Sequence, residues 1–274
     1  MIDSPAFSRL GFGVTGPHAS IIGSNTKTRE LVHACVAHGV TLFDTGPAYG
    51  AGRAETRLGE ALREVPRDKV FVCTKAGMHA GRFRDFSPGA VEMSLKDSLE
   101  RLKTDHVDLL LLHGPAPEEL TDKLIRHLEA FKVRGMIRHL GICGRGPELE
   151  AAARISAMDA VMAPLNSELT TQEIERLENC KKAGQSIIGI EVMKGAAKSA
   201  RIPLNASSAW YFARHIKQVA LGRTAPPSGR SPQEALSWAL DHPLSDSVIS
   251  LTTSLTHLDA NARLAGLEGS ASSA

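Results

Sequence analysis

Short apolar segments alternate along the chain with longer segments that have helical periodicity. Glycine, proline or polar residues bound each apolar segment, which is typical of a buried strand. The expected strands are 10–14, 40–45, 70–75, 107–113, 139–144, 160–166, 186–193 and 247–253. The expected helices, whose apolar residues recur at helical spacing, are 28–39, 54–65, 90–102, 118–132, 147–157, 171–184 and 231–242. This alternation predicts repeated βα units.

The apolar strands are continuous rather than alternating, so both faces of the sheet are expected to be buried, as in a parallel sheet covered by helices. Eight such strands in one α/β domain predict a (β/α)8 TIM barrel, a fold of about 250 residues. The alternative is a doubly wound open sheet, which concentrates its site at one switch point. Candidate polar residues here follow several different strands, which favours the barrel. We expect it to form a single catalytic domain over residues 1–265.

Two segments interrupt this rhythm. Residues 194–230 are too long for a simple connection and have a helical middle, so we expect an insertion over the barrel mouth. Residues 266–274 are small and polar, which predicts a disordered tail.

Aromatic residues gather at two places in a chain that contains only 4% of them. Trp210, Tyr211 and Phe212 lie in the expected insertion, where they either line a substrate pocket or anchor a helix. Phe83 and Phe86 follow the third expected strand and leave the same choice.

Composition excludes several classes of protein. The 274 residues carry a net charge of +2 with both signs interspersed, which argues against nucleic acid or an anionic membrane as partner. The four cysteines are scattered without a CxxC pair, which argues against a metal site or a disulfide framework. No apolar stretch is long enough to span a bilayer, and the N-terminus has no basic region before an apolar one. These features predict a cytoplasmic protein and favour no particular oligomeric state.

The segment GFGVTG contains the G-x-G-x-x-G spacing of a dinucleotide fold at Gly11, Gly13 and Gly16. That motif needs a helix that opens on its last glycine and presents its amides to a pyrophosphate. Residues 17–25 have no helical apolar face, so we interpret these glycines as part of a tight turn.

Complementary polar residues follow three consecutive expected strands. Asp44 ends the second, Lys75 the third and His113 the fourth, and Tyr49 lies in the Gly-Pro turn after Asp44. Taken singly, each has an ordinary explanation: a turn-forming acid, a lysine that extends to solvent, a core histidine, a packed tyrosine. Because all four are expected at one end of a barrel, together they indicate a catalytic site.

Each of these groups has a role in delivering a proton to a carbonyl oxygen. A free tyrosine titrates near pH 10, so we expect the Lys75 ammonium to favour the Tyr49 phenolate. Asp44 is the counter-ion for a buried lysine. His113 is expected to hydrogen-bond the substrate oxygen and orient it.

The four residues in their local sequences resemble the catalytic tetrad of the aldo-keto reductases. FDTGPAYG with AETRLGEAL matches the family at Asp44, Tyr49 and Glu55, FVCTKAG matches at Lys75, and VDLLLLHGP matches at His113. The resemblance extends from about residue 9 to 265 through SLERLKTDHVDLL, RGMIRHLGI, APLN and SVISLTTSLTHLDAN. It implies a (β/α)8 barrel in which hydride passes from a nicotinamide to a carbonyl carbon while Tyr49 supplies the proton.

The resemblance also implies an extended NADP(H) cofactor, with NAD(H) as the alternative. The implied cofactor-binding residues are Gly13, Val14, Cys143, Asn166, Met193, Lys194, Thr252, His257 and Asn261. The implied substrate is a small aldehyde, ketone or sugar.

The cofactor positions depart from the family pattern in two ways. Cys143, Gly144 and Met162 stand where a Ser-Asn pair and a Gln usually hold the carboxamide, and Met193 stands where many members stack an aromatic ring. Leu251 and His257 fall where cations usually grip the 2′-phosphate, which weakens the case for NADP(H).

Two other functions compete with carbonyl reduction. A strand-end Lys75 could form a Schiff base and act in an aldolase or lyase, although a nearby Asp44 keeps the ammonium charged. A nicotinamide-binding regulatory protein with little turnover is also consistent with the altered carboxamide positions.

Overall fold

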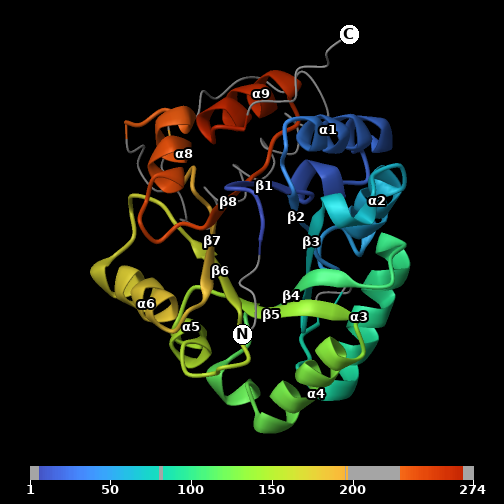
Figure 1. The fold of residues 1–274 in the computed structure, drawn as a ribbon, viewed down its shortest axis with the longest axis vertical. Coiled ribbons are helices and arrows are strands. Elements are labelled where there is room, and N and C mark those ends of the chain that lie inside the picture. Colours follow the sequence, from blue (N-terminus) through green and yellow to red (C-terminus); the bar gives the residue numbers. More distant parts are fainter. Residues whose placement is uncertain (1–5, 80–82, 195, 197–228, 268–274) are drawn as a thin grey trace.

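The computed structural model describes residues 6–79, 83–194, 196 and 229–267. Eight parallel strands form a closed barrel in which each strand pairs with its neighbours in sequence and β1 pairs with β8 (Figure 1). The strands are β1 (Leu10–Gly13), β2 (Leu42–Asp44), β3 (Phe71–Ala76), β4 (Val107–His113), β5 (Ile137–Cys143), β6 (Ala160–Pro164), β7 (Ser186–Ile190) and β8 (Ser247–Ser250). The predicted (β/α)8 barrel and all eight expected strands are confirmed.

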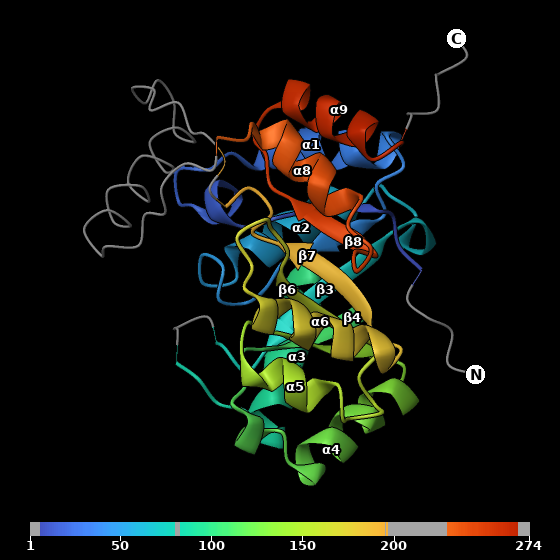
Figure 2. The ribbon, with the colours of Figure 1, turned by 90° about the vertical axis from the view of Figure 1, so that its left-hand side faces the viewer.

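Helices surround the barrel as an outer ring (Figures 1 and 2). They are α1 (Asn25–Ala37), α2 (Arg53–Leu62), α3 (Pro88–Leu102), α4 (Asp122–Val133), α5 (Pro147–Ala152), α6 (Thr171–Lys182), α8 (Pro232–Leu240) and α9 (Leu255–Leu264), with one-turn 3-10 helices η1 (Gly16–Ala19), η2 (Arg67–Lys69) and η3 (Pro117–Glu119). The short η1 follows the glycine-rich segment after β1, so no α-helix opens on Gly16 and the closed barrel excludes a dinucleotide-type open sheet.

The sequence patterns predicted no helix at α9, which closes the ring between α1 and α8 (Figure 1). Its segment contains two polar residues in the first turn and was identified only as part of the family resemblance. Ser254 caps it by accepting a hydrogen bond from the His257 amide at 3.4 Å.

Buried side chains fall into two layers. One cluster consists of strand residues alone and fills the barrel: Leu42, Phe71, Cys73, Leu109, Leu111, Cys143, Ala160, Met162 and Ile188. The other lies between the strands and the helices, and it contains the alternate strand residues, such as Phe43, Val72 and Leu110. Strand side chains alternate between these layers with a period of two, so the direction of a residue near a strand end follows from the residues below it.

Part of the predicted organisation lies outside the described residues. Of the expected insertion 194–230, only Lys194, Ala196, Gly229 and Arg230 are described, so Trp210, Tyr211 and Phe212 are not. Of the expected tail, only residues 266 and 267 are described. Within the described ranges, no helix has the length and apolarity needed to cross a bilayer.

Candidate active site at the carboxyl end of the barrel

Alternation along the strands directs three of the four candidate side chains into the barrel. Asp44 lies two residues beyond Leu42, Lys75 two beyond Cys73, and His113 two beyond Leu111, and the lower residue of each pair belongs to the interior cluster. All three side chains therefore lie just beyond the interior cluster, at the carboxyl ends of β2, β3 and β4. TIM-barrel active sites lie at this end of the barrel.

Lys75 and Asp44 form a buried ion pair. Their side chains are 1% and 5% exposed, and the Lys75 ammonium also donates a hydrogen bond to the Thr45 carbonyl at 2.8 Å. Burial is the largest single effect and by itself disfavours the ammonium, but Asp44, together with the ionisable groups around it, holds the pKa of Lys75 well above its usual range. Lys75 is therefore a fixed cation at neutral pH.

The loop after β2 brings Tyr49 to this cation. The Tyr49 amide donates to the Gly46 carbonyl at 3.0 Å, and Gly50, Ala51 and Gly52 then all adopt positive φ before α2 begins. A Cβ at Gly50 would lie 2.1 Å from the Ala19 carbonyl oxygen, so only glycine fits there. This turn places the Lys75 Nζ 5.0 Å from the centroid of the Tyr49 ring.

Tyr49 remains a protonated phenol in this environment. Burial raises the pKa of Tyr49 to about 12, and the opposing charge of Lys75 only limits that rise. Lys75 favours the phenolate as expected, because its charge lowers the pKa of Tyr49, but desolvation is the larger effect and the net pKa is raised. A neutral phenol suits a proton donor.

His113 completes the group. Its ring meets the Tyr49 ring edge-on, with 6.0 Å between centroids. Burial lowers the pKa of His113 to about 4, helped by the charges of Lys75 and Arg145, so the imidazole is neutral at pH 7. Its Nδ1 is buried and has no hydrogen-bond partner among the described residues. We therefore assign the proton to Nε2, which leaves that nitrogen as the donor.

Glu55 supports the group from α2. Its carboxylate is fully buried, accepts a hydrogen bond from the Thr74 hydroxyl at 2.5 Å and pairs with Arg101 at 2.7 Å. Because Thr74 precedes Lys75 on β3, this contact joins α2, β3 and α3 behind the ion pair. Glu55 is thus a structural support and does not belong to the interior group.

Of the implied cofactor residues near the nicotinamide end, Gly13 and Cys143 lie in the barrel interior. A Cβ at Gly13 would lie 3.0 Å from the Ile249 side chain, and Cys143 belongs to the interior cluster. Burial raises the pKa of Cys143 to about 11, so it is a thiol. Val14 and Met193 pack instead into the layer between barrel and helices, which limits Val14 to backbone contacts.

The remaining implied residues lie in the loops and in α9. Asn166 is buried, donates to the Glu191 carbonyl at 3.3 Å and accepts from the Glu168 amide at 3.1 Å, so its amide braces the ends of β6 and β7. Lys194 is exposed beside Glu168. The other three follow β8: Thr252 and Asn261 are buried, and His257 is exposed in the first turn of α9.

The sequence interpretation missed two features of this end of the barrel. Ile190, two residues beyond Ile188, contacts the interior cluster in the region where Met193 was expected. Arg145 after β5 pairs with Glu191 after β7 and so bridges the end of β6. Strand alternation could have identified Ile190, whereas no local pattern indicates the ion pair.

The two described phenylalanines after β3 behave differently. Phe86 is buried in the outer layer, and a Cβ at Gly77 would lie 2.0 Å from its ring, so it has a packing role. Phe83 is 59% exposed and stacks on His79 with 4.4 Å between ring centroids.

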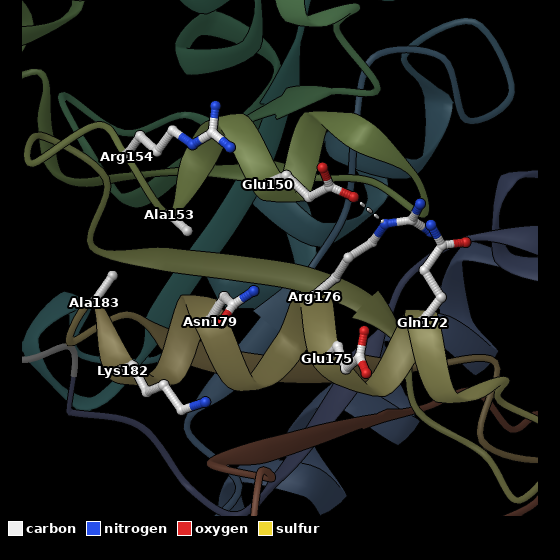
Figure 3. A pocket seen from close by; sticks show the side chains of 9 residues that line it. All are labelled: Glu150, Ala153, Arg154, Gln172, Glu175, Arg176, Asn179, Lys182 and Ala183. Atoms are coloured by element: carbon white, nitrogen blue, oxygen red, sulfur yellow. Dashed lines mark hydrogen bonds and ion pairs between the residues drawn. The ribbon is translucent and has the colours of Figure 1, made fainter.

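A separate groove of about 590 Å³ lies between α5 and α6 on the flank of the barrel (Figure 3). Charged side chains line it, including Glu150 and Arg176, which pair at 2.8 Å (Figure 3). None of the four candidate residues borders this groove, so it is not the candidate active site. The described part of the chain also contains no cluster of His, Cys, Asp or Glu able to hold a metal ion.

Comparisons with known proteins agree with this geometry. The sequence profile of the Aldo/keto reductase family matches residues 10–272. A 6-dehydroglucose reductase of Agrobacterium fabrum is 27% identical over 254 residues, which cover 88% of this chain and 83% of that protein. The L-galactose dehydrogenase of Arabidopsis thaliana is 35% identical over 144 residues, which cover 50% of this chain and 44% of that protein.

A solved structure shares the fold. An aldo-keto reductase from Bacillus halodurans in its holo form superposes with a TM-score of 0.74 at 22% identity, over 96% of this chain and 91% of that one.

Proposed function

Because the chain belongs to the aldo/keto reductase family, and is therefore an oxidoreductase that acts on carbonyls and alcohols, we propose that Tyr49 is its general acid and base. The observation that carries this proposal is the convergence of Tyr49, Lys75, Asp44 and His113 at the carboxyl end of the barrel. A neutral phenol, a fixed cation and a neutral imidazole there are the groups that proton delivery to a carbonyl oxygen requires.

Each of these four residues has a separate role in carbonyl reduction. When bound, a reduced nicotinamide supplies hydride to the carbonyl carbon. Tyr49 donates its proton to the oxygen, and the Lys75 cation stabilises the phenolate that remains. His113 donates from Nε2 to the same oxygen and orients it. Asp44 keeps Lys75 charged and in place.

The described residues fit a nicotinamide dinucleotide. Gly13 leaves the end of β1 without a side chain, beside the interior group. The segment after β8 leads into α9, and a helix N-terminus beside the last strands of a TIM barrel is a common phosphate site. Gly13, Thr252 and Asn261 would therefore hold the dinucleotide.

The charges after β8 favour NAD(H) over NADP(H). Residues 251–261 contain no lysine or arginine, and Leu251 and His257 occupy the positions implied for the phosphate-binding cations. Arg263, later in the same helix, is paired with Asp259 at 2.9 Å. A 2′-phosphate would thus lack cationic partners in this segment, whereas a ribose hydroxyl needs only an uncharged or acidic hydrogen-bonding group.

The proposed substrate is a sugar or another small polar carbonyl compound. This assignment rests on the similarity to two sugar-acting relatives, a 6-dehydroglucose reductase and an L-galactose dehydrogenase.

The geometry supports this function over the two alternatives. A Schiff-base lysine must lose its proton, but Asp44 and the Thr45 carbonyl both engage the Lys75 ammonium, and its pKa lies well above the usual range. A regulatory protein without turnover does not require four complementary groups around one position.

Incubation of the purified protein with NADH or NADPH and a panel of aldoses and aldehydes tests the proposal. We expect consumption of the reduced nicotinamide to depend on the carbonyl compound. Nicotinamide binding without turnover across the panel would favour the regulatory protein. Trapping of a substrate adduct on Lys75 by borohydride would favour the lyase.

A further inference from the structure

A buried histidine joins the loop after β1 to the loop after β8. His18, in η1, is 3% exposed. Its Nε2 lies 2.9 Å from the Thr252 carbonyl oxygen, and its Nδ1 lies 3.0 Å from the Thr28 hydroxyl. A carbonyl oxygen only accepts, so Nε2 carries the proton, and in the neutral ring Nδ1 is an acceptor that shares the single Thr28 hydroxyl proton with the Ser24 carbonyl, 3.0 Å from that hydroxyl. Both ring nitrogens are therefore used, and they face two different elements.

The β1 side of this contact is held rigidly by α2. The Arg57 guanidinium donates to the carbonyls of Ser20 and Gly23 at 2.9 and 2.6 Å, and also to the carbonyl of His18 itself. Arg53 donates to the Ala19 carbonyl at 2.8 Å. These bonds hold the backbone around His18 in place relative to α2, and so they also fix the position of the imidazole.

The β8 side of this contact is the segment that leads into α9. Thr252 accepts from the Ser254 amide at 3.1 Å, and Ser254 in turn caps α9. Asn261 anchors the helix by donating to the Ser250 hydroxyl at 2.9 Å. Among the described residues, the Thr252 backbone carbonyl accepts a hydrogen bond from His18 alone. Removal of the His18 imidazole would therefore free the turn at Thr252, which lies between Ser250, bound by Asn261, and Ser254, the cap of α9.

We propose that His18 is a positioning residue for the phosphate and ribose part of the dinucleotide. It acts through Thr252: the imidazole holds the turn after β8 at a fixed distance from the end of β1, and so sets the position of the N-terminus of α9. This inference rests on the proposed function, because it needs a dinucleotide that spans the ends of β1 and β8. The two ring nitrogens of His18 bond to Thr28 and Thr252, and to none of the four candidate residues at the reacting end of the site.

Loss of the hydrogen bond between His18 and Thr252 should therefore weaken coenzyme binding and leave the chemical step unchanged. Loss of one hydrogen bond that preorganises a binding segment corresponds to about a tenfold rise in Kd. Glutamine offers an NH2 donor group and one oxygen acceptor on a side chain of similar reach, so we expect His18→Gln to keep both contacts.

The test compares His18→Ala, His18→Gln and the parent by calorimetric titration with NADH, NADPH and ADP-ribose, the last being a probe without the nicotinamide. We expect Kd to rise about tenfold for His18→Ala with every nucleotide that the parent binds, and His18→Gln to stay within about threefold of the parent. At saturating coenzyme, kcat should change by less than about twofold. His33→Ala is the matched control, since His33 contacts the Ala61 carbonyl at 2.9 Å between α1 and α2.

Thr28→Val is a second variant in case His18→Ala does not fold, and it should also raise Kd because it removes the partner of Nδ1. Unchanged Kd in the folded variants would overturn the inference, and so would His18→Gln that binds as weakly as His18→Ala. A fall in kcat with unchanged Kd would overturn it as well. If the parent protein binds no dinucleotide, both the proposed function and this inference are overturned. If the parent binds a dinucleotide and the variants bind it with the same Kd, only the inference is overturned.

Discussion

The Lys75 ammonium lies 5.0 Å from the centroid of the Tyr49 ring, while Asp44 and the Thr45 carbonyl hold it from the other side. Without the cation, burial alone would raise the pKa of the Tyr49 phenol further. With it, the phenol is neutral at pH 7, and the phenolate that remains after proton donation has a counter-charge beside it.

The pKa of Tyr49 predicts opposite pH dependences for the two directions. Alcohol oxidation needs the phenolate, whose fraction rises with pH until the pKa of about 12. We expect kcat/KM for oxidation to rise steadily from about pH 7 to 10 and that for reduction to stay level. Initial rates across this range check it. An oxidation profile that levels off near neutrality would contradict the assignment.

The buried ion pair predicts strong coupling between Asp44 and Lys75. Asp44→Asn should destabilise the fold by about 3 kcal/mol, because it leaves a buried ammonium without its counter-charge. The double variant with Lys75→Met should cost clearly less than the two single changes together. Urea unfolding of the four proteins gives the cycle. Lys27→Met is the control, because its pair with Glu30 is exposed and should contribute less than about 0.5 kcal/mol.

His113 predicts a pH-dependent contribution to stability. Its pKa is lowered to about 4 in the fold from about 6.5 in the unfolded chain, so between these values the unfolded state binds the extra proton. Stability should therefore fall as the pH drops from about 6.5 to 4. His113→Gln should reduce this slope by up to about 1.4 kcal/mol per pH unit. Unfolding free energies at several pH values check it; equal slopes would contradict it.

Coenzyme choice should follow the charge after β8. The parent is expected to bind NADH more tightly than NADPH. Leu251→Lys combined with His257→Arg should tighten NADPH binding by about tenfold and change NADH binding little, since the new cations meet only the 2′-phosphate. Parallel titrations with both nucleotides check this. A parent that prefers NADPH would contradict the charge argument.

Much of the fold followed from local patterns. The apolar strands and helical periodicity predicted the barrel. Leu42 and Asp44, like Leu111 and His113, are two residues apart and share a face of their strand, so this spacing would have placed the polar residues inside the barrel. The candidate tetrad was predicted because three of its members end consecutive strands.

The remainder depended on contacts between distant residues. His18 meets Thr252 across 234 positions, and Arg145 meets Glu191 across 46, so no sequence window contains both partners. The net pKa of Tyr49 also required the structure, because desolvation depends on everything packed around the ring. The position of Met193 near the nicotinamide was implied by the family resemblance alone; in the structure Met193 follows the end of β7 at Ile190 and packs against the outer layer.

The most direct test of the central claim is the Tyr49→Phe variant. Removal of the phenolic hydroxyl should lower kcat/KM for carbonyl reduction by about 10²-fold to 10⁴-fold, since the proton donor is lost. The Kd for the reduced coenzyme should stay within about threefold of the parent, because Tyr49 has no role in holding the dinucleotide. A Tyr49→Phe protein that binds coenzyme normally and reduces the same aldehyde at the parent rate would contradict the account.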